Sequence, residues 1–149
     1  MLFRSKLFPE QRALAVKATY VLRNPHARPM AEVPLTVGAH FQTSGWTVDG
    51  VAVDPEQRDQ PAPAIENRSR LYVVRPARPL ARDATVTVSF QLDGVYPRGW
   101  SRITSGAGEF LLPSGVVLTS FGPSFLPVVG FGEGIGVDDK NRQIGRAHV

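Results

Sequence analysis

The amino-acid sequence predicts an all-β domain: an antiparallel β-sandwich or saddle-like sheet with long loops and an irregular apolar C-terminal segment. The 13 prolines and 14 glycines recur too often for long helices, and they fall between short apolar runs. Within several of these runs, apolar and polar side chains alternate. That alternation is typical of strands that bury one face.

The first part of the chain contains two extended runs joined by a turn. "RALAVKATYVLRN" (12–24) predicts a long half-buried strand, whose apolar face carries Leu14, Val16, Ala18, Tyr20 and Leu22. The one helix candidate is the short "PEQRAL" (9–14), but the alternation after it favours a strand. "NPHARPM" (24–30) is a turn, because its prolines oppose both helix and ladder pairing. "AEVPLTVGAHF" (31–41) resumes an extended path that includes His40, and Pro34 suggests an edge strand or a bulge.

The middle of the chain contains the clearest hairpin. In "WTVDGVAVD" (46–54), Asp49-Gly50 supplies the positive φ angles of a type I′ turn. "PEQRDQPAPAIENRS" (55–69) reads as a polar, proline-rich loop, and "RLYVVRP" (70–76) as a strand. In "PLARDATVTVSFQLDG" (79–94), one face of a strand carries Ala84, Val86, Val88 and Phe90 and the other Thr85, Thr87 and Ser89. We expect Tyr20, Trp46 and Phe90 to be buried between the sheets.

The last third is apolar and interrupted by prolines. "EFLLP" (109–113) and "VVLTSF" (116–121) are expected to be short strands around a Ser114-Gly115 turn, followed by the irregular "GPSFLPVVGF" (122–131). Residues 116–131 hold more large apolar side chains than one edge of a small sheet can cover. We expect an exposed apolar patch, poor solubility and loss of order after about Gly130. The alternative is that the segment folds back as two further strands and completes the sandwich.

Composition bounds the class of protein. The chain has 149 residues, enough for one domain with a core, and no cysteine, which excludes disulfides and thiolate metal sites. The net charge is +4, but the arginines are scattered. Solvated strand faces are therefore favoured over a phosphate-binding surface, and no nucleic-acid partner is expected. No apolar stretch approaches the roughly 20 residues that span a bilayer, and the first residues do not form a signal peptide, so this segment is expected to be soluble.

The final residues 143–149, "QIGRAHV", have no cap, turn or apolar anchor. The codons CAG ATC GGA AGA GCA CAC GTC encode them and contain a string that resembles an adapter used in short-read DNA sequencing. We therefore expect residues 143–149 to be an adapter-derived tail and residues 1–142 to be the N-terminal β-domain of a larger, truncated protein.

No catalytic, cofactor-binding or metal-binding residues are predicted. His26, His40 and His148 have no metal-ligand spacing, and Ser114 and Ser120 lack a nucleophile context. The glycine-rich stretch 130–136 matches neither phosphate-loop pattern, and residues 138–141 lack the ligand pattern of a calcium loop.

The order of these pieces resembles the N-terminal β-domain of the gluzincin (aminopeptidase N-like) zinc metallopeptidases. The stretch "LFPEQRALAVKATYVLRNPHARPMAEVPLTV" is similar to the family's opening, where a second strand carries G-x-Y-x-L-x-N and a turn follows. "WTVDGVAVD" and "RLYVVRPARPLARDATVTVSFQ" are similar to its next hairpin and to its L-x-R-P-L segment. The soluble aminopeptidases carry P-C-F-D-E-P in the last third, which this sequence lacks. Residues 126–131 are closer to the LP-x-x-G-Y block, and residues 138–142 to the acidic-to-Arg block, of a bacterial subfamily fused behind an ABC-type permease. The resemblance covers roughly residues 6–142.

The resemblance implies that zinc, its H-E-x-x-H ligands and the catalytic glutamate belong to a missing downstream domain. The family's substrate-gripping glutamine is absent near Ser120 and Phe121, which puts aminopeptidase specificity of the parent in doubt.

The preferred hypothesis is a non-catalytic domain of a membrane-linked zinc-peptidase-like protein, which scaffolds the catalytic domain and forms one wall of its cleft. Its partners would be that domain and an upstream permease domain, with a peptide substrate possible. This fragment would bind no zinc, and it would be associated with a membrane only through its parent protein. The alternatives are a free-standing β-sandwich that binds carbohydrate or protein, and a transport accessory domain that has lost peptidase chemistry.

Overall fold

The computed structural model describes residues 1–58, 69–96, 110–112, 115–117 and 125–130. Its elements are, in chain order, β1 (Leu2–Phe8), a 3-10 turn η1 (Pro9–Gln11), β2 (Ala13–Arg23), β3 (Val33–Gly38), β4 (Phe41–Val48), β5 (Val51–Ala52), β6 (Glu56–Arg58), β7 (Ser69–Val74), β8 (Thr85–Val95), β9 (Phe110–Leu112), β10 (Gly115–Val117) and β11 (Val128–Val129). The described part of the chain contains no helix long and apolar enough to cross a membrane.

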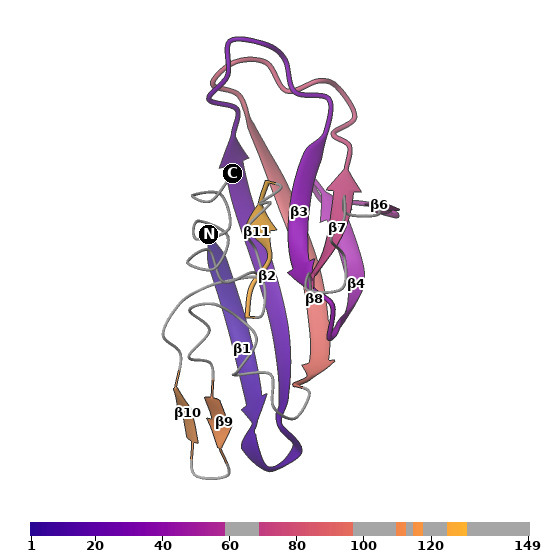
Figure 1. Ribbon diagram of the computed structural model, residues 1–149. Helices are drawn as coiled ribbons and strands as arrows, with labels where there is room; N and C mark the ends of the chain where they lie inside the picture. Colours follow the sequence, from indigo (N-terminus) through magenta and orange to yellow (C-terminus); the bar gives the residue numbers. More distant parts are fainter. Residues whose placement is uncertain (59–68, 97–109, 113–114, 118–124, 131–149) are drawn as a thin grey trace, which may run out of the picture.

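Two antiparallel sheets form the body of the molecule (Figure 1). The first sheet has the order β1-β2-β8-β4-β5, and the second has the order β11-β3-β7-β6. The strands β9 and β10 pair with each other as a separate antiparallel hairpin. The predicted all-β sandwich is therefore confirmed.

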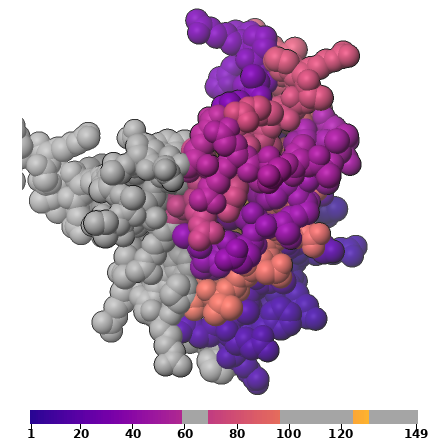
Figure 2. Space-filling model, turned by 90° about the vertical axis from the view of Figure 1, so that its right-hand side faces the viewer, coloured from indigo at the N-terminus to yellow at the C-terminus, as the bar shows by residue number. Residues whose placement is uncertain are grey.

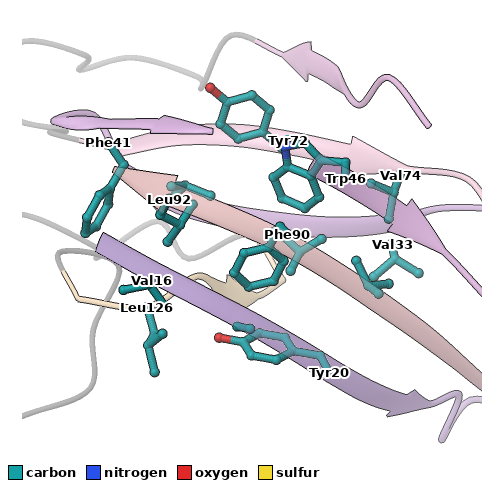
Figure 3. Packing of buried hydrophobic residues seen from close by; sticks show 14 of the residues in the cluster. Val16, Tyr20, Val33, Phe41, Trp46, Tyr72, Val74, Phe90, Leu92 and Leu126 are labelled. Atoms are coloured by element: carbon teal, nitrogen blue, oxygen red, sulfur yellow. The ribbon is translucent and has the colours of Figure 1, made fainter. Parts of the chain in front are cut away.

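The core lies between the two sheets because β2 and β8 each bury one face along most of their length. Their buried side chains alternate as predicted: Leu14, Val16, Ala18 and Tyr20 on β2, and Val86, Val88, Phe90 and Leu92 on β8. The ring of Phe90 lies between those of Tyr20 and Trp46, with centroids 5.1 Å and 5.0 Å away (Figure 3). The expected burial of these three aromatic side chains is thus confirmed.

The predicted hairpin at Asp49-Gly50 joins β4 to β5. Asp49 has φ 49° and Gly50 has φ 81°, the two positive values that a type I′ turn requires. Asp49 tolerates this conformation better than most residues, and its Oδ1 also accepts a hydrogen bond from the backbone N of Thr87 at 2.8 Å. The turn is therefore tied to the neighbouring strand β8.

Residues 9–14 do not form an α-helix, as the alternation after them indicated: η1 covers only Pro9–Gln11, and the strand begins at Ala13. Two local expectations need correction. The stretch expected to be a loop from residue 55 contains strand β6, since Glu56–Arg58 pairs with β7, whereas residues 59–68 lie outside the described residues. His40 is not in a strand, because the chain turns at residues 39–40 as it crosses from β3 in one sheet to β4 in the other.

The expected strands of the last third are only partly described. Strands β9 and β10 flank residues 113–114, and Gly115 belongs to β10 rather than to the turn. Ser114 and the stretches 118–124 and 131–149 lie outside the described residues, and with them the expected loss of order after Gly130 and the tail at 143–149.

Candidate functional site

The first feature is residues 125–130, here called the C-terminal block, which pack against the sandwich. The block does not form an exposed apolar patch, because Phe125 and Leu126 are each only 2% exposed. Phe125 packs edge-on against Phe3 of β1, with ring centroids 6.1 Å apart. Burial of two such side chains contributes about 1.5–3 kcal/mol each. The expectation of exposure is therefore wrong for Phe125 and Leu126, although Val129 remains 46% exposed.

A buried hydrogen bond holds the middle of the C-terminal block. The hydroxyl of Tyr20 donates to the main-chain carbonyl of Pro127 at 2.9 Å. Tyr20 is 3% exposed, and its burial raises the pKa of the phenol to about 12. The hydroxyl therefore stays protonated at neutral pH and remains a donor.

The end of the C-terminal block adds a strand to the second sheet. Val128 and Val129 lie opposite Thr36 and Leu35 of β3, and the next backbone N–H, that of Gly130, donates to the carbonyl of Pro34 at 2.9 Å. In a regular ladder the N–H of the residue at position 34 would bond back to Gly130, but proline has none. The hydroxyl of Thr36 donates to the Gly130 carbonyl instead, at 2.8 Å. Pro34 thus lies on a strand that is flanked on both sides, and its missing donor faces the two-residue strand β11.

A second feature is an ion-pair cluster at the β6 edge of the second sheet, the side of the molecule that Figure 2 presents. Arg58 forms a bidentate pair with Glu32, at 2.8 Å and 2.7 Å, and its Nε donates to Glu56 at 2.7 Å. Arg75 also donates to both glutamates. These side chains are 36–53% exposed, so the cluster is a solvent-exposed ion-pair network. It links the short strand β6 to the residue that precedes β3 and to the residue that follows β7.

The cluster does not provide a proton donor for chemistry at neutral pH. Hydrogen bonds from Arg58 and Arg75 lower the pKa of the Glu56 carboxyl to about 2, and the same two partners lower the pKa of Glu32. Both carboxylates stay ionised. Sequence reasoning missed this cluster, because its four residues are dispersed along the chain and two of them fall in a stretch that reads as a loop.

The two described histidines lie apart. His26 is exposed in the turn after β2, and its backbone N donates to the Asn24 side chain at 2.9 Å. His40 stacks on the rings of Phe41 and Tyr96, with centroids 4.0 Å and 4.5 Å away. Because strand β3 separates the two turns, these histidines cannot share a ligand. Within the described ranges, no three His, Cys, Asp or Glu side chains are grouped so that they could hold a metal ion; Ser114, Ser120 and His148 lie outside those ranges.

Comparisons with known proteins give no neighbour: no family model, curated protein or solved structure matches the chain.

Proposed function

We propose that this chain is a non-catalytic β-domain of a membrane-linked zinc-aminopeptidase-like protein, in which it scaffolds the catalytic domain and forms one wall of its cleft. The observation that carries the proposal is the anchoring of the C-terminal block. Residues 126–131 stand for the LP-x-x-G-Y block of the permease-fused subfamily, and the described part of that stretch is the part fixed to the sandwich. The resemblance therefore falls on residues with a definite structural role.

The anchoring suits a scaffold for a mechanical reason. Leu126 is buried in the core, Pro127 is bonded to β2 through Tyr20, and Gly130 is bonded to β3 twice. The block therefore contacts strands of both sheets (Figure 1). A block anchored in this way would give a domain attached beyond it a fixed point of attachment on the sandwich.

The motif on strand β2 supports the same proposal. The stretch Ala18–Asn24 corresponds to the family pattern G-x-Y-x-L-x-N, with alanine in place of the glycine. Its Tyr20 holds the C-terminal block, and its Asn24 is fully buried. The Asn24 amide donates to the carbonyls of Arg28 and Leu80, at 2.9 Å and 2.8 Å, and so joins the turn after β2 to the one before β8.

In this proposal the chemistry belongs to other parts of the parent. Zinc and its ligands would lie in the downstream domain, and membrane attachment would come from the upstream permease domain. The described β-domain would contact a peptide substrate only as a wall of the cleft, and nucleic acid would not be a partner.

The test compares this chain with a longer one that carries the next domain. We expect hydrogen exchange in residues 116–131 to slow in the longer chain, because part of that surface would become buried, and we expect stoichiometric zinc only there. Equal exchange in both chains would count against the scaffold role. Zinc that this chain retains through dialysis against a weak chelator would count against its non-catalytic assignment.

One observation favours the second candidate, a free-standing β-sandwich binding module. An open apolar C-terminal third would argue against a self-contained module. Phe125 and Leu126 are buried, so this objection does not apply to them. The third candidate, a transport accessory domain without peptidase chemistry, differs from the first only in the absence of H-E-x-x-H downstream.

A further inference from the structure

The outer face of the first sheet carries an open hollow of about 320 Å³ that spans strands β1, β2, β8 and β4. The side chains that reach into it are those of Leu2, Arg4, Lys17, Thr19, Ser89 and Gln91, because alternation points their neighbours Phe3, Ala18 and Phe90 toward the core. Its volume lies at the lower end of the range of small-molecule sites.

Two cations face each other across this hollow. Arg4 on β1 lies directly opposite Lys17 on β2, and both side chains are exposed. Like charges in directly opposite positions destabilise an antiparallel pair. The acidic residue in the neighbouring row, Asp93, lies opposite Ala15, and within the described residues neither Arg4 nor Lys17 forms an ion pair. The fold thus brings together two positive charges that are 13 positions apart in the sequence.

Neutral donors continue the same rows. Lys17 lies opposite Gln91, whose amide can donate, and the neighbouring pair Thr19 and Ser89 share a hydrogen bond of 3.0 Å between their hydroxyls. Because only one of these two hydroxyls uses its hydrogen in that bond, the other can donate to a ligand.

A bulge shapes the far wall. The pairing of β4 with β8 shifts between Ser44 and Thr47, and Gly45 adopts φ 60° there. A Cβ at Gly45 would lie 2.8 Å from Nε2 of Gln91, so glycine lets the Gln91 amide occupy this position. Bulges commonly re-aim side chains next to functional sites.

We propose that this hollow binds a phosphate- or sulfate-type oxyanion, held between Arg4 and Lys17 and bonded by the Gln91 amide and the free hydroxyl hydrogen. An oxyanion replaces the repulsion of the two cations by charge-assisted hydrogen bonds, and the guanidinium fork suits two of its oxygens. The proposal is independent of the scaffold role. The anion can be a free phosphate compound or a lipid headgroup, since both present the same chemistry.

The test titrates the full chain with inorganic phosphate at constant ionic strength and follows backbone amide chemical shifts. We expect saturable shifts at residues 4, 17–19 and 89–91, and about tenfold weaker binding in Lys17→Gln. Arg78→Gln removes an exposed arginine of a distant loop and should leave binding unchanged. Equal weakening in both variants, or shifts spread over all cationic residues, would overturn the proposal.

A charge reversal separates binding from folding. Lys17→Glu places a carboxylate opposite Arg4, so it should raise the melting temperature at low salt while it abolishes phosphate binding. A Lys17→Glu protein that still binds phosphate would contradict the proposal.

A parallel arm of the test uses vesicles that contain phosphatidic acid. If Lys17-dependent binding is seen with the vesicles and not with soluble phosphate, the anion is a lipid headgroup. If soluble phosphate binds, the anion is a free compound. Independence from Lys17 in both arms overturns the site.

Discussion

The hydroxyl of Thr36 donates a hydrogen bond to the main-chain carbonyl of Gly130, 2.8 Å away, across a sequence separation of 94 residues. It does so beside Pro34, whose ring removes the backbone donor that a regular ladder would supply. A side chain on β3 thus completes the pairing that a proline on the same strand leaves incomplete.

The first prediction is an energetic coupling between Thr36 and Pro34. Thr36→Val leaves the Gly130 carbonyl without its donor and should lower the free energy of unfolding by about 1–2 kcal/mol. In a Pro34→Ala background the restored N–H can donate to Gly130, so the same change should cost less. A double-mutant cycle by denaturant unfolding measures this difference, and strictly additive effects would show that the Thr36 hydroxyl does not stand in for the missing donor.

The second prediction concerns Tyr20 at high pH. Its pKa is raised from 10.0 to about 12 by burial, so the stability that the protonated phenol contributes is fully present below pH 10 and is lost as the pH rises through 12. Tyr20→Phe should remove this pH dependence and lower stability at neutral pH by about 1–3 kcal/mol, because the Pro127 carbonyl loses its donor. If the free energy of unfolding changed with pH in the same way for both proteins from pH 9 to 12, that result would argue against the buried bond.

The third prediction concerns Asn24, a fully buried polar residue. Asn24→Ala removes the bonds to Arg28 and Leu80 and the acceptor for the His26 backbone, and should cost about 3 kcal/mol. His26→Ala, in the same turn, keeps its backbone donor and should change stability by less than about 0.5 kcal/mol. Thermal or urea unfolding compares them, and equal effects of the two changes would refute the role of the Asn24 amide.

The fourth prediction concerns the ion-pair cluster. The pKa of Glu56 is held near 2 by Arg58 and Arg75, so its contribution to stability is present above pH 4.5 and is lost as the pH falls toward 2. Arg58→Gln should raise this pKa toward 4.5, which carboxyl carbon NMR titration measures directly. Arg78→Gln is the control that leaves it low. An unchanged Glu56 pKa in Arg58→Gln would mean that the bonds to Arg58 do not form in solution.

The sequence predicted the elements whose signal is local. Alternation identified β2 and β8, because each buries one face against the core along most of its length. Asp49-Gly50 identified the hairpin, because a type I′ turn needs positive φ angles that few residue pairs adopt. Burial of Tyr20, Trp46 and Phe90 followed from the same alternation.

The elements that sequence reasoning missed depend on distant partners. Strand β6 has three polar residues and no periodicity, and it pairs with β7 where Arg58 bonds Glu32, 26 residues away. Phe125 and Leu126 were expected to be exposed because the core cluster that buries them is otherwise made of residues before position 97, with Phe3 of β1 packed against Phe125. The hollow near Arg4 and Lys17 arises from strand register, which composition does not report.

The most direct test of the scaffold role is the source DNA that follows the codon for Arg142. We predict an open reading frame that continues in place of residues 143–149 and encodes H-E-x-x-H in the next domain, with a permease-like membrane region upstream. A stop codon at that point, or a following domain unrelated to a peptidase, would contradict the account.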